Sequence, residues 1–227
     1  MSVQKRGPSA PSAGRPTHTV LPREVVDELR QVCRGPRAER AIADLERAVT
    51  LLARGDHKAA VKEATKAKEA AQRSAAVREV LGLALYSGGR FQDALAELKT
   101  YRRISGRLDQ NHLIADCHRA LGAPEKAVAL VEEEMRGRVP EEARAEAAVV
   151  GASALADLGR YPEALALLRR FAKRSDVGRD WDLRIWYVTG DILERAGRPE
   201  EAAREFKKVV RHDSGAFDAA ERLAQLS

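Results

Sequence analysis

Aromatic residues are scarce in this sequence, making up 4% of its 227 residues, whereas hydrophobic residues of all kinds make up 44%. A hydrophobic core must therefore consist mainly of alanine and aliphatic side chains, which suit close packing of one helix on another. Few stretches contain enough valine, isoleucine and threonine to form β-strands. The sequence therefore predicts an all-α protein, and its length allows a sizeable core.

Cysteine is rarer still, with Cys33 and Cys117 in different predicted elements. No disulfide framework is implied, and a reducing compartment is favoured. No apolar run approaches the roughly 20 residues needed to cross a membrane, and the amino terminus lacks the apolar core of a secretion signal. These absences predict a cytoplasmic protein with no membrane partner. The excess of arginine over lysine, 30 to 10, suggests a GC-rich bacterial genome such as an actinobacterial one.

Acidic residues are absent from the first 22 residues, which contain four prolines and several glycines and serines. Such a composition buries too little apolar surface to offset the entropy of ordering the chain. We expect residues 1–21 to form a disordered basic leader and residues 22–227 to form a single domain. The basic residues of the leader could contact a polyanion, although a solubilising tail is the favoured interpretation.

Catalytic and cofactor-binding motifs are also missing. The sequence contains no glycine-rich phosphate loop, no HExxH metal motif and no nucleophile elbow, so neither an enzyme nor a cofactor is predicted. Cys117 and His118 are adjacent and point in different directions, and His118 occupies a position that is apolar in other parts of the chain. A packed histidine is therefore favoured over a metal ligand. Cys33 lies among arginines that could lower its pKa, but an inert thiol is the favoured interpretation.

What the sequence does contain is a fivefold pattern centred on glycines, with steps of 34, 33, 37 and 38 residues. The glycines are Gly55, Gly89, Gly122, Gly159 and Gly197. A small residue stands seven positions before each glycine and an alanine five positions after it, at Ala48 and Ala60, Gly82 and Ala94, Ala115 and Ala127, Ala152 and Ala164, and Gly190 and Ala202. Nine positions after the glycines stand Ala64, Leu98, Val131, Leu168 and Phe206. This agreement predicts five copies of one structural unit.

The second copy, residues 75–104, shows how one unit is built. Apolar residues recur at helical spacing before and after Gly88 and Gly89, so each half forms a helix with one face to bury. Glycine suits the left-handed conformation that often ends a helix, and small residues let the two helices approach where they cross. Each copy is therefore predicted to be an αα-hairpin. The longer steps add about one helical turn, either in the first helix of the unit or in the connectors at 136–140 and 175–180.

This pattern resembles the tetratricopeptide repeat, a helix–turn–helix unit of about 34 residues with a small residue, a turn glycine and an alanine at these offsets. The resemblance covers about residues 37–212. It is weaker where polar residues replace bulky apolar ones, namely Asp44 and Arg47 in the first copy and Asn111 and His118 in the third. It implies an α-solenoid, a right-handed superhelix of about five repeats, at about 37–72, 75–105, 107–136, 140–174 and 180–212.

Shorter helices are predicted at both ends of the array, because a stack of repeats needs its terminal faces covered. Residues 22–34 begin with a proline suited to a first helical turn, continue with apolar residues at helical spacing and are stopped by a Gly-Pro pair. At the other end, Asp213 or Ser214 can cap a helix that covers residues 215–226.

The resemblance also implies where a ligand binds, because the first helices of the family's repeats line a concave groove. By register, the groove residues are Glu79, Leu83, Tyr86, His112, Asp116, Arg119, Val149, Ser153, Tyr187, Asp191, Glu194 and Arg195. Trp186 belongs to the core by the same register. The family's clamp for the carboxyl terminus of a chaperone uses lysines, asparagines and an arginine. Its positions here hold Glu79, Leu83, His112 and Asp116, so that activity is not implied.

The predicted function is therefore a non-enzymatic scaffold or adaptor that binds a protein or peptide partner in the groove. Three groove residues, His112, Asp116 and Arg119, share one helix face and form either a surface ion-pair ladder or a cluster that grips the partner. Self-association is left open, since an apolar patch around Leu83 and Tyr86 would favour it if it is uncovered.

Charge asymmetry supports a second hypothesis, because residues 1–110 carry a net charge of +8 and residues 111–227 carry −2. Basic residues recur along two predicted second helices and could bind a polyanion. These residues are Lys58, Lys62, Lys66, Lys99, Arg102, Arg103 and Arg107. Aromatic side chains that stack on single-stranded nucleic acid are nearly absent. Association with nucleic acid is therefore the alternative to the protein scaffold.

Overall fold

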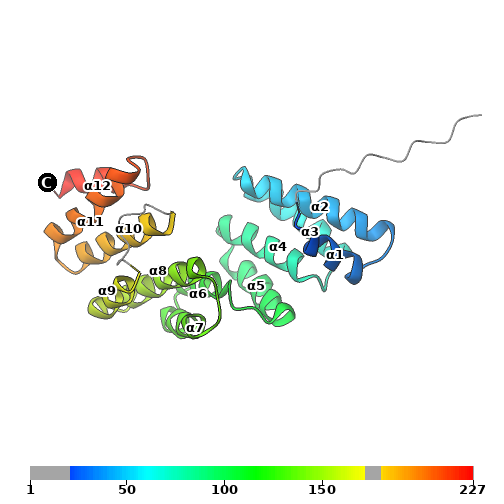
Figure 1. Cartoon of the computed structure of the whole chain (residues 1–227), viewed down its shortest axis with the longest axis horizontal. Coiled ribbons are helices and arrows are strands. Elements are labelled where there is room, and N and C mark those ends of the chain that lie inside the picture. The colour runs from blue at the N-terminus through cyan, green and yellow to red at the C-terminus, as the bar shows by residue number, and fades with distance from the viewer. Residues whose placement is uncertain (1–20, 172–179, 227) are drawn as a thin grey trace, which may run out of the picture.

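The computed structural model describes residues 21–171 and 180–226, and every regular element in these residues is a helix (Figure 1). The predicted leader, apart from Leu21, and most of the connector at 175–180 lie outside the described residues. The helices are α1 (Arg23–Val32), α2 (Pro36–Ala53), α3 (His57–Ala70), α4 (Ala75–Ser87), α5 (Phe91–Ser105), α6 (Asn111–Ala120), α7 (Pro124–Arg136), α8 (Glu141–Asp157), α9 (Tyr161–Arg169), α10 (Asp180–Arg195), α11 (Pro199–His212) and α12 (Ala219–Gln225). The all-α prediction is confirmed.

Ten of these helices form five hairpins, which pair α2 with α3, α4 with α5, α6 with α7, α8 with α9 and α10 with α11. Each hairpin also packs against the first helix of the next one, as α3 packs on α4 and α7 on α8. The hairpins follow a curved path, with α6, α8 and α10 on its inner side and α7 and α9 on its outer side (Figure 1). The predicted solenoid of helix–turn–helix units is confirmed, with α1 and α12 at its ends.

Each hairpin turns at the predicted glycine. The five turn glycines have φ between 71° and 78°, a left-handed conformation that is unfavourable for residues with a Cβ atom. The residue after each glycine donates a backbone hydrogen bond to the carbonyl five positions earlier, as Arg90 does to Leu85 at 2.9 Å. This hydrogen bond of the Schellman motif closes the first helix. The second helix can then return along it.

In two hairpins the small residue seven positions before the turn glycine lies directly against the apolar residue nine positions after that glycine. A Cβ built on Gly82 would lie 2.7 Å from Cδ2 of Leu98, and one built on Gly190 would lie 2.7 Å from Cε1 of Phe206. Carbon atoms that are not bonded to each other do not approach so closely. The two helices of these hairpins therefore reach their observed spacing because the position carries no side chain.

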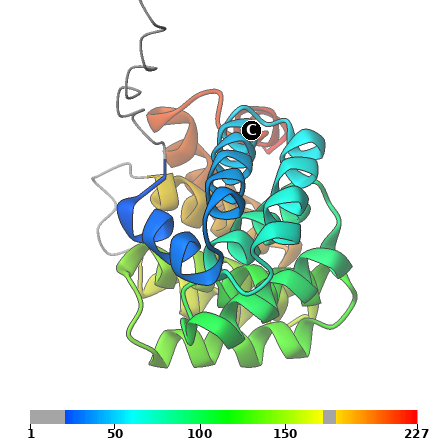
Figure 2. The same cartoon turned by 90° about the vertical axis from the view of Figure 1, so that its right-hand side faces the viewer.

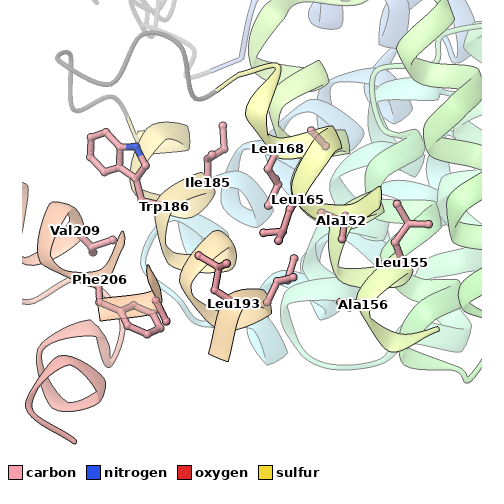
Figure 3. Close-up of a cluster of buried hydrophobic side chains, with 14 of the residues drawn as sticks. Ala152, Leu155, Ala156, Leu165, Leu168, Ile185, Trp186, Leu193, Phe206 and Val209 are labelled. Atoms are coloured by element: carbon pink, nitrogen blue, oxygen red, sulfur yellow. The ribbon is translucent and has the colours of Figure 1, made fainter. Parts of the chain in front are cut away.

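The last two hairpins share a continuous apolar core. Figure 3 shows this core between α8, α9, α10 and α11, with Leu168 and Ile185 near its centre. Trp186 and Phe206 are 1% and 0% exposed, which makes them two of the largest fully buried side chains of the described residues. The Trp186 ring also stacks on His212, with 5.0 Å between ring centroids. The prediction that Trp186 belongs to the core is confirmed.

The extra residues of the two long steps lie in the first helices of the last two units. α8 contains 17 residues and α10 contains 16, whereas α4 contains 13 and α6 contains 10. Since about 3.6 residues make one turn, α8 and α10 are about one turn longer than α4. Of the two explanations that the sequence left open, a longer first helix is therefore the one observed for the fourth unit, whereas residues 172–179 of the connector before the fifth unit lie outside the described residues.

The first helix, α1, holds the first two units together. Leu29 of α1 is fully buried in a cluster that includes residues of α2 and α4. Glu28 accepts hydrogen bonds from the backbone N–H groups of Ala75, at 2.5 Å, and Ala76, at 3.4 Å. A carboxylate at this position satisfies donors that have no partner within α4. Figure 2 shows α1 lying against one end of α2, so α1 fastens two units and covers only part of the terminal face.

The last helix differs from its prediction. α12 begins at Ala219, several residues later than predicted, and it has no side-chain cap, so the predicted capping role of Asp213 or Ser214 is wrong. Oδ1 of Asp213 instead accepts the backbone N–H of Gly215 at 2.9 Å. Phe217 has φ of 56°, which is incompatible with a helix running through it. The predicted helix therefore loses its first turn.

Candidate functional site

The twelve residues predicted to line a groove belong to α4, α6, α8 and α10, and we call the surface that these residues form the inner face. None of these twelve residues is buried, since eleven are half-buried and one is exposed. They are Glu79, Leu83, Tyr86, His112, Asp116, Arg119, Val149, Ser153, Tyr187, Asp191, Glu194 and Arg195. Each of them therefore keeps some surface that a partner could contact.

Tyr86, Asp116 and Arg119 form the first part of a ladder of polar contacts between successive repeats. The hydroxyl of Tyr86 on α4 donates to Oδ2 of Asp116 on α6 at 2.6 Å. Nε of Arg119 donates to Oδ1 of the same carboxylate at 2.7 Å, and its Nη1 donates to Oδ2 of Asp157 on α8 at 3.2 Å. Asp116 and Arg119 thus form the ion-pair ladder that the sequence left open, whereas His112 takes no part in it.

Asp157 continues the ladder from α8 to α10. Its Oδ1 accepts from Nη2 of Arg195 at 3.1 Å, and the same nitrogen donates to the backbone oxygen of Ala156 at 2.9 Å. Asp157 was not among the predicted residues. It and Arg195 both stand two positions before a turn glycine, so their shared register was a usable signal.

The ladder ends on Arg222 of α12, which was also not predicted to belong to the groove. Nη2 of Arg222 lies 3.0 Å from Oδ1 of Asp191 and 2.7 Å from Oε2 of Glu194. Its guanidinium carbon lies 4.6 Å from the centroid of the Phe206 ring, which is within the range of a cation–π contact. α12 therefore contacts predicted groove residues of the last unit.

The two tyrosines of the inner face keep their hydroxyl protons at neutral pH. Burial and the hydrogen bond to Asp116 raise the pKa of Tyr86, and burial and the hydrogen bond to Asp218 raise the pKa of Tyr187. A neutral phenol donates to a carboxylate, whereas a phenolate would repel it. Both contacts are therefore stable over the physiological pH range.

Four further predicted residues lie on the inner face outside the ladder. Oγ of Ser153 donates to the backbone oxygen of Val149 at 2.9 Å, within α8. Glu79 on α4 accepts from Nε2 of Gln110 at 2.7 Å, and burial raises its pKa. Leu83 and Val149 add half-buried apolar side chains. The inner face thus combines polar contacts between repeats with apolar surface.

The hairpins, their turn glycines and their contacts between small and large residues belong to a known repeat. The family model described as tetratricopeptide repeat matches residues 45–107 and 149–219, which is more than half of the chain. The chain belongs to this family. The third tetratricopeptide repeat, α6 and α7, lies outside both matched segments, in agreement with the weaker resemblance that Asn111 and His118 indicated.

Solved structures of other tetratricopeptide repeat proteins share the fold, and at identities of 20% or less they show the fold alone. A thermophilic repeat protein from Thermus thermophilus has a TM-score of 0.68 and 20% identity, over 82% of this chain and 98% of its own. YrrB has a TM-score of 0.53 and 17% identity, over 81% and 91%. The quorum sensor NprR from B. thuringiensis has a TM-score of 0.64 and 15% identity, over 88% and 62%. No curated protein sequence matches the chain.

A buried polar contact lies inside the third tetratricopeptide repeat. Nδ1 of His112 lies 3.2 Å from Oε1 of Glu134, whose side chain is fully buried. The other oxygen of Glu134 and both polar atoms of the buried Asn111 side chain have no hydrogen-bond partner among the described residues. Burial raises the pKa of Glu134, and the contact with His112 opposes this effect in part. His112 therefore contacts the interior of its own repeat.

Glu134→Gln is expected to stabilise the protein increasingly as pH rises. Burial raises the pKa of Glu134 in the folded state above the unfolded-state value of about 4.3. The protonated Glu134 therefore contributes fully to the free energy of unfolding below that pH, and this contribution is lost as pH rises through the folded-state pKa. Glutamine does not titrate, so the free energy of unfolding of the variant, relative to that of the wild type, should increase with pH with a limiting slope of about 1.4 kcal/mol per pH unit. Urea unfolding at several pH values measures this difference. Glu125→Gln, at an exposed position of α7, is the control, and a difference independent of pH would contradict the prediction.

The predicted polyanion patch lies on and beside α3 and α5, and part of its charge is neutralised within the chain. Three of its seven residues form ion pairs: Lys66 with Glu63, Arg102 with Glu133 and Arg107 with Asp109. The other four are exposed: Lys58, Lys62, Lys99 and Arg103. Cations that already have carboxylate partners attract a polyanion less strongly. Nothing in the comparisons favours the nucleic-acid alternative.

A cleft of about 350 Å³ lies between α7, α8 and α9, and none of the predicted groove residues lines it. Its lining includes Val131, Met135, Leu155 and Leu167, together with three arginines and two glutamates. A Cβ built on Gly151, which also lines the cleft, would lie 2.7 Å from Cγ1 of Val131. Glycine at this position lets α8 approach α7 closely, so the cleft is a small hollow between tightly packed helices.

Both cysteine thiols lie in the interior. Cys33 and Cys117 are both free and buried, and burial, with a smaller effect of Asp116, raises the pKa of Cys117 to about 12. The thiolate of Cys117, which is the reactive form, is therefore disfavoured.

His118 is half-buried, and its pKa is lowered by burial and by two nearby lysines. The described residues contain no cluster of three or more potential metal ligands, and no helix among them is long and apolar enough to cross a membrane.

Proposed function

We propose that this chain is a non-enzymatic adaptor that holds an extended or helical segment of a partner protein against its inner face. Membership of the family supports the general function, because tetratricopeptide repeat proteins mediate protein–protein interactions. The observation that carries the specific proposal is the ladder from Tyr86 to Arg222. It connects the inner faces of four repeats, so a segment lying there would contact several repeats at once.

The ladder supports the proposal because it fixes much of the inner face before a partner arrives. Side chains that are already held in one conformation lose less entropy on binding. The arginines and aspartates of the ladder are only partly covered, so they can form further hydrogen bonds with a partner. Leu83 and Val149 supply apolar surface that gains stability when it is covered.

Two of the similar proteins are consistent with a peptide-sized partner. YrrB has an unusual peptide-binding site, and NprR is a quorum sensor. We also place the protein in the bacterial cytoplasm, since both of its cysteines are free and arginine greatly outnumbers lysine. A reducing compartment would keep both thiols in the observed state.

Photo-crosslinking in the source organism tests which face binds the partner. A photoreactive benzoylphenylalanine in place of Leu83 or Ser153 is expected to crosslink one partner protein, because both positions lie on the inner face. The same residue in place of Lys62 or Lys99 should not crosslink that partner. Both lysines are exposed on second helices, so accessibility does not limit the control. Equal crosslinking at all four positions would contradict the proposal.

Once that partner is isolated, Leu83→Glu is expected to weaken its binding at least tenfold, which is about 1.4 kcal/mol. The substitution places a charge where the partner would cover an apolar side chain, and covering an unpaired charge is unfavourable. Isothermal titration calorimetry measures the affinity. Lys62→Glu changes the charge at an exposed position of α3 and should leave the affinity within about twofold of the wild type. An unchanged affinity of the Leu83→Glu variant would exclude this part of the inner face.

A further inference from the structure

α12 lies on the inner face of the last repeat, where a partner segment is proposed to lie. Arg222 of α12 pairs with Asp191 and Glu194, which were both predicted groove residues. Asp218, just before α12, accepts a hydrogen bond at 2.6 Å from the hydroxyl of Tyr187, a third predicted groove residue. α12 and the residue before it therefore cover part of the candidate site.

The surroundings of Arg222 form a binding site for a guanidinium group. Its Nη2 lies 3.0 Å from Asp191 and 2.7 Å from Glu194, its Nε lies 3.2 Å from Glu194, and its Nη1 lies 3.3 Å from the hydroxyl of Tyr187. The Phe206 ring lies 4.6 Å from the guanidinium carbon. All three nitrogens thus have an acceptor, and the planar group lies near an aromatic ring. A lysine ammonium, which is a single point of charge, cannot make this set of contacts.

The segment that carries Arg222 is short and has few buried residues. α12 contains seven residues, of which Ala219 is buried and Leu223 is half-buried against the core. Phe217 leads into the helix with φ of 56° and is 54% exposed, although its ring lies 4.6 Å from that of Tyr187. Short helices are marginal in water, and segments with few buried contacts open more readily than the core. α12 is therefore expected to detach more readily than the longer helices of the array.

The carboxylates also favour a cation when Arg222 is absent from the site. Of the remaining arginines, Arg195 lies 3.8 Å from Asp191, but it is also paired with Asp157 at 3.1 Å. Asp191 and Glu194 would then form a partly buried site with an excess of negative charge. A cation relieves this repulsion, and the aromatic rings favour a guanidinium.

We propose that the site formed by Tyr187, Asp191, Glu194 and Phe206 binds an arginine of the partner segment, and that Arg222 is an internal competitor for it. This inference rests on the proposed function and adds the chemistry of the partner. α12 must detach before the partner's arginine can enter the site. A change that favours the detached state of α12 therefore increases the affinity for the partner's arginine, because a larger fraction of the protein is competent to bind it.

A synthetic peptide with the sequence of residues 214–226 contains the same arginine and serves as the probe. Its binding, measured by fluorescence anisotropy, is expected to be at least about tenfold tighter to the full chain carrying Arg222→Gln than to the wild type. A peptide with lysine in place of the arginine should bind to this variant at least about tenfold more weakly. Equal affinities of the two proteins, or of the two peptides, would overturn the proposal.

Further variants separate competition from damage to the fold. Arg222→Lys keeps the positive charge, and its circular dichroism spectrum should equal that of the wild type while its affinity for the arginine peptide rises. Adding Asp191→Asn and Glu194→Gln to the Arg222→Gln chain should abolish binding of the peptide, and binding that persists would overturn the proposal.

Crosslinking of the partner through position 83 reports on the adaptor function by itself, so a failure of the arginine site is distinguishable from a failure of the proposed function.

Discussion

Phe206→Ala is expected to lower the free energy of unfolding by about 3–5 kcal/mol. The Phe206 ring is fully buried between α10 and α11, with its edge against the backbone of Gly190 and its face near Arg222. Removing the ring leaves a cavity that the surrounding helices can fill only in part. Because each repeat contacts only its neighbours, the loss should be concentrated in the last two repeats and α12.

Urea unfolding followed by circular dichroism measures this change. Phe217→Ala is the matched control, since it removes the same ring from a position that is 54% exposed, and it should cost less than about 1 kcal/mol. Hydrogen exchange of Phe206→Ala should show lost protection in α10 and α11 and retained protection in α2 to α5. A cost similar to that of the control would contradict the packing described for the last repeat.

Gly190→Ala is expected to destabilise the protein by up to about 2 kcal/mol, although alanine favours helices. The new Cβ would lie 2.7 Å from Cε1 and 2.9 Å from Cζ of Phe206, and the ring is enclosed by the core. Overpacking of this kind costs about 1–3 kcal/mol, whereas the gain in helix propensity over glycine is about 1 kcal/mol. The unfavourable contact is therefore expected to dominate.

Phe206→Leu should recover most of the stability lost through Gly190→Ala. The fourth repeat has Ala152 and Leu168 at the same two positions, and both are buried there. The fold therefore already accommodates this pair of residues. In a double-mutant cycle measured by urea unfolding, the two substitutions should couple by about 1–2 kcal/mol. A coupling near zero would show that these residues do not set the spacing between α10 and α11.

The repeats could be predicted because their determinants are local. A turn glycine such as Gly89 ends a helix through its own backbone conformation, and a small residue such as Gly82 meets Leu98 within the same hairpin. Five copies of this arrangement make chance agreement implausible. The start of α12 could not be predicted in the same way, because Phe217 adopts a left-handed conformation while its ring packs on Tyr187 of another helix.

The candidate site could be predicted only in part. Register grouped residues that contact one another between successive repeats, such as Tyr86 and Asp116, but it did not reveal Asp157 or Arg222 as members of the ladder. Register also treats His112 and Tyr187 as equivalent, since both stand ten positions before a turn glycine. His112 nevertheless contacts the buried Glu134, because the third repeat has a carboxylate where the first has alanine.

The sequence by itself determined which residues form helices, where each hairpin turns and which side of each helix is buried. Periodicity, turn chemistry and side-chain size act within one hairpin, so a single chain is enough to read them. Only the tertiary structure decided which arginine meets which carboxylate, and that α12 lies on the inner face of the last repeat. Those contacts join residues 28 to 38 positions apart, so they depend on how successive repeats are spaced and curved.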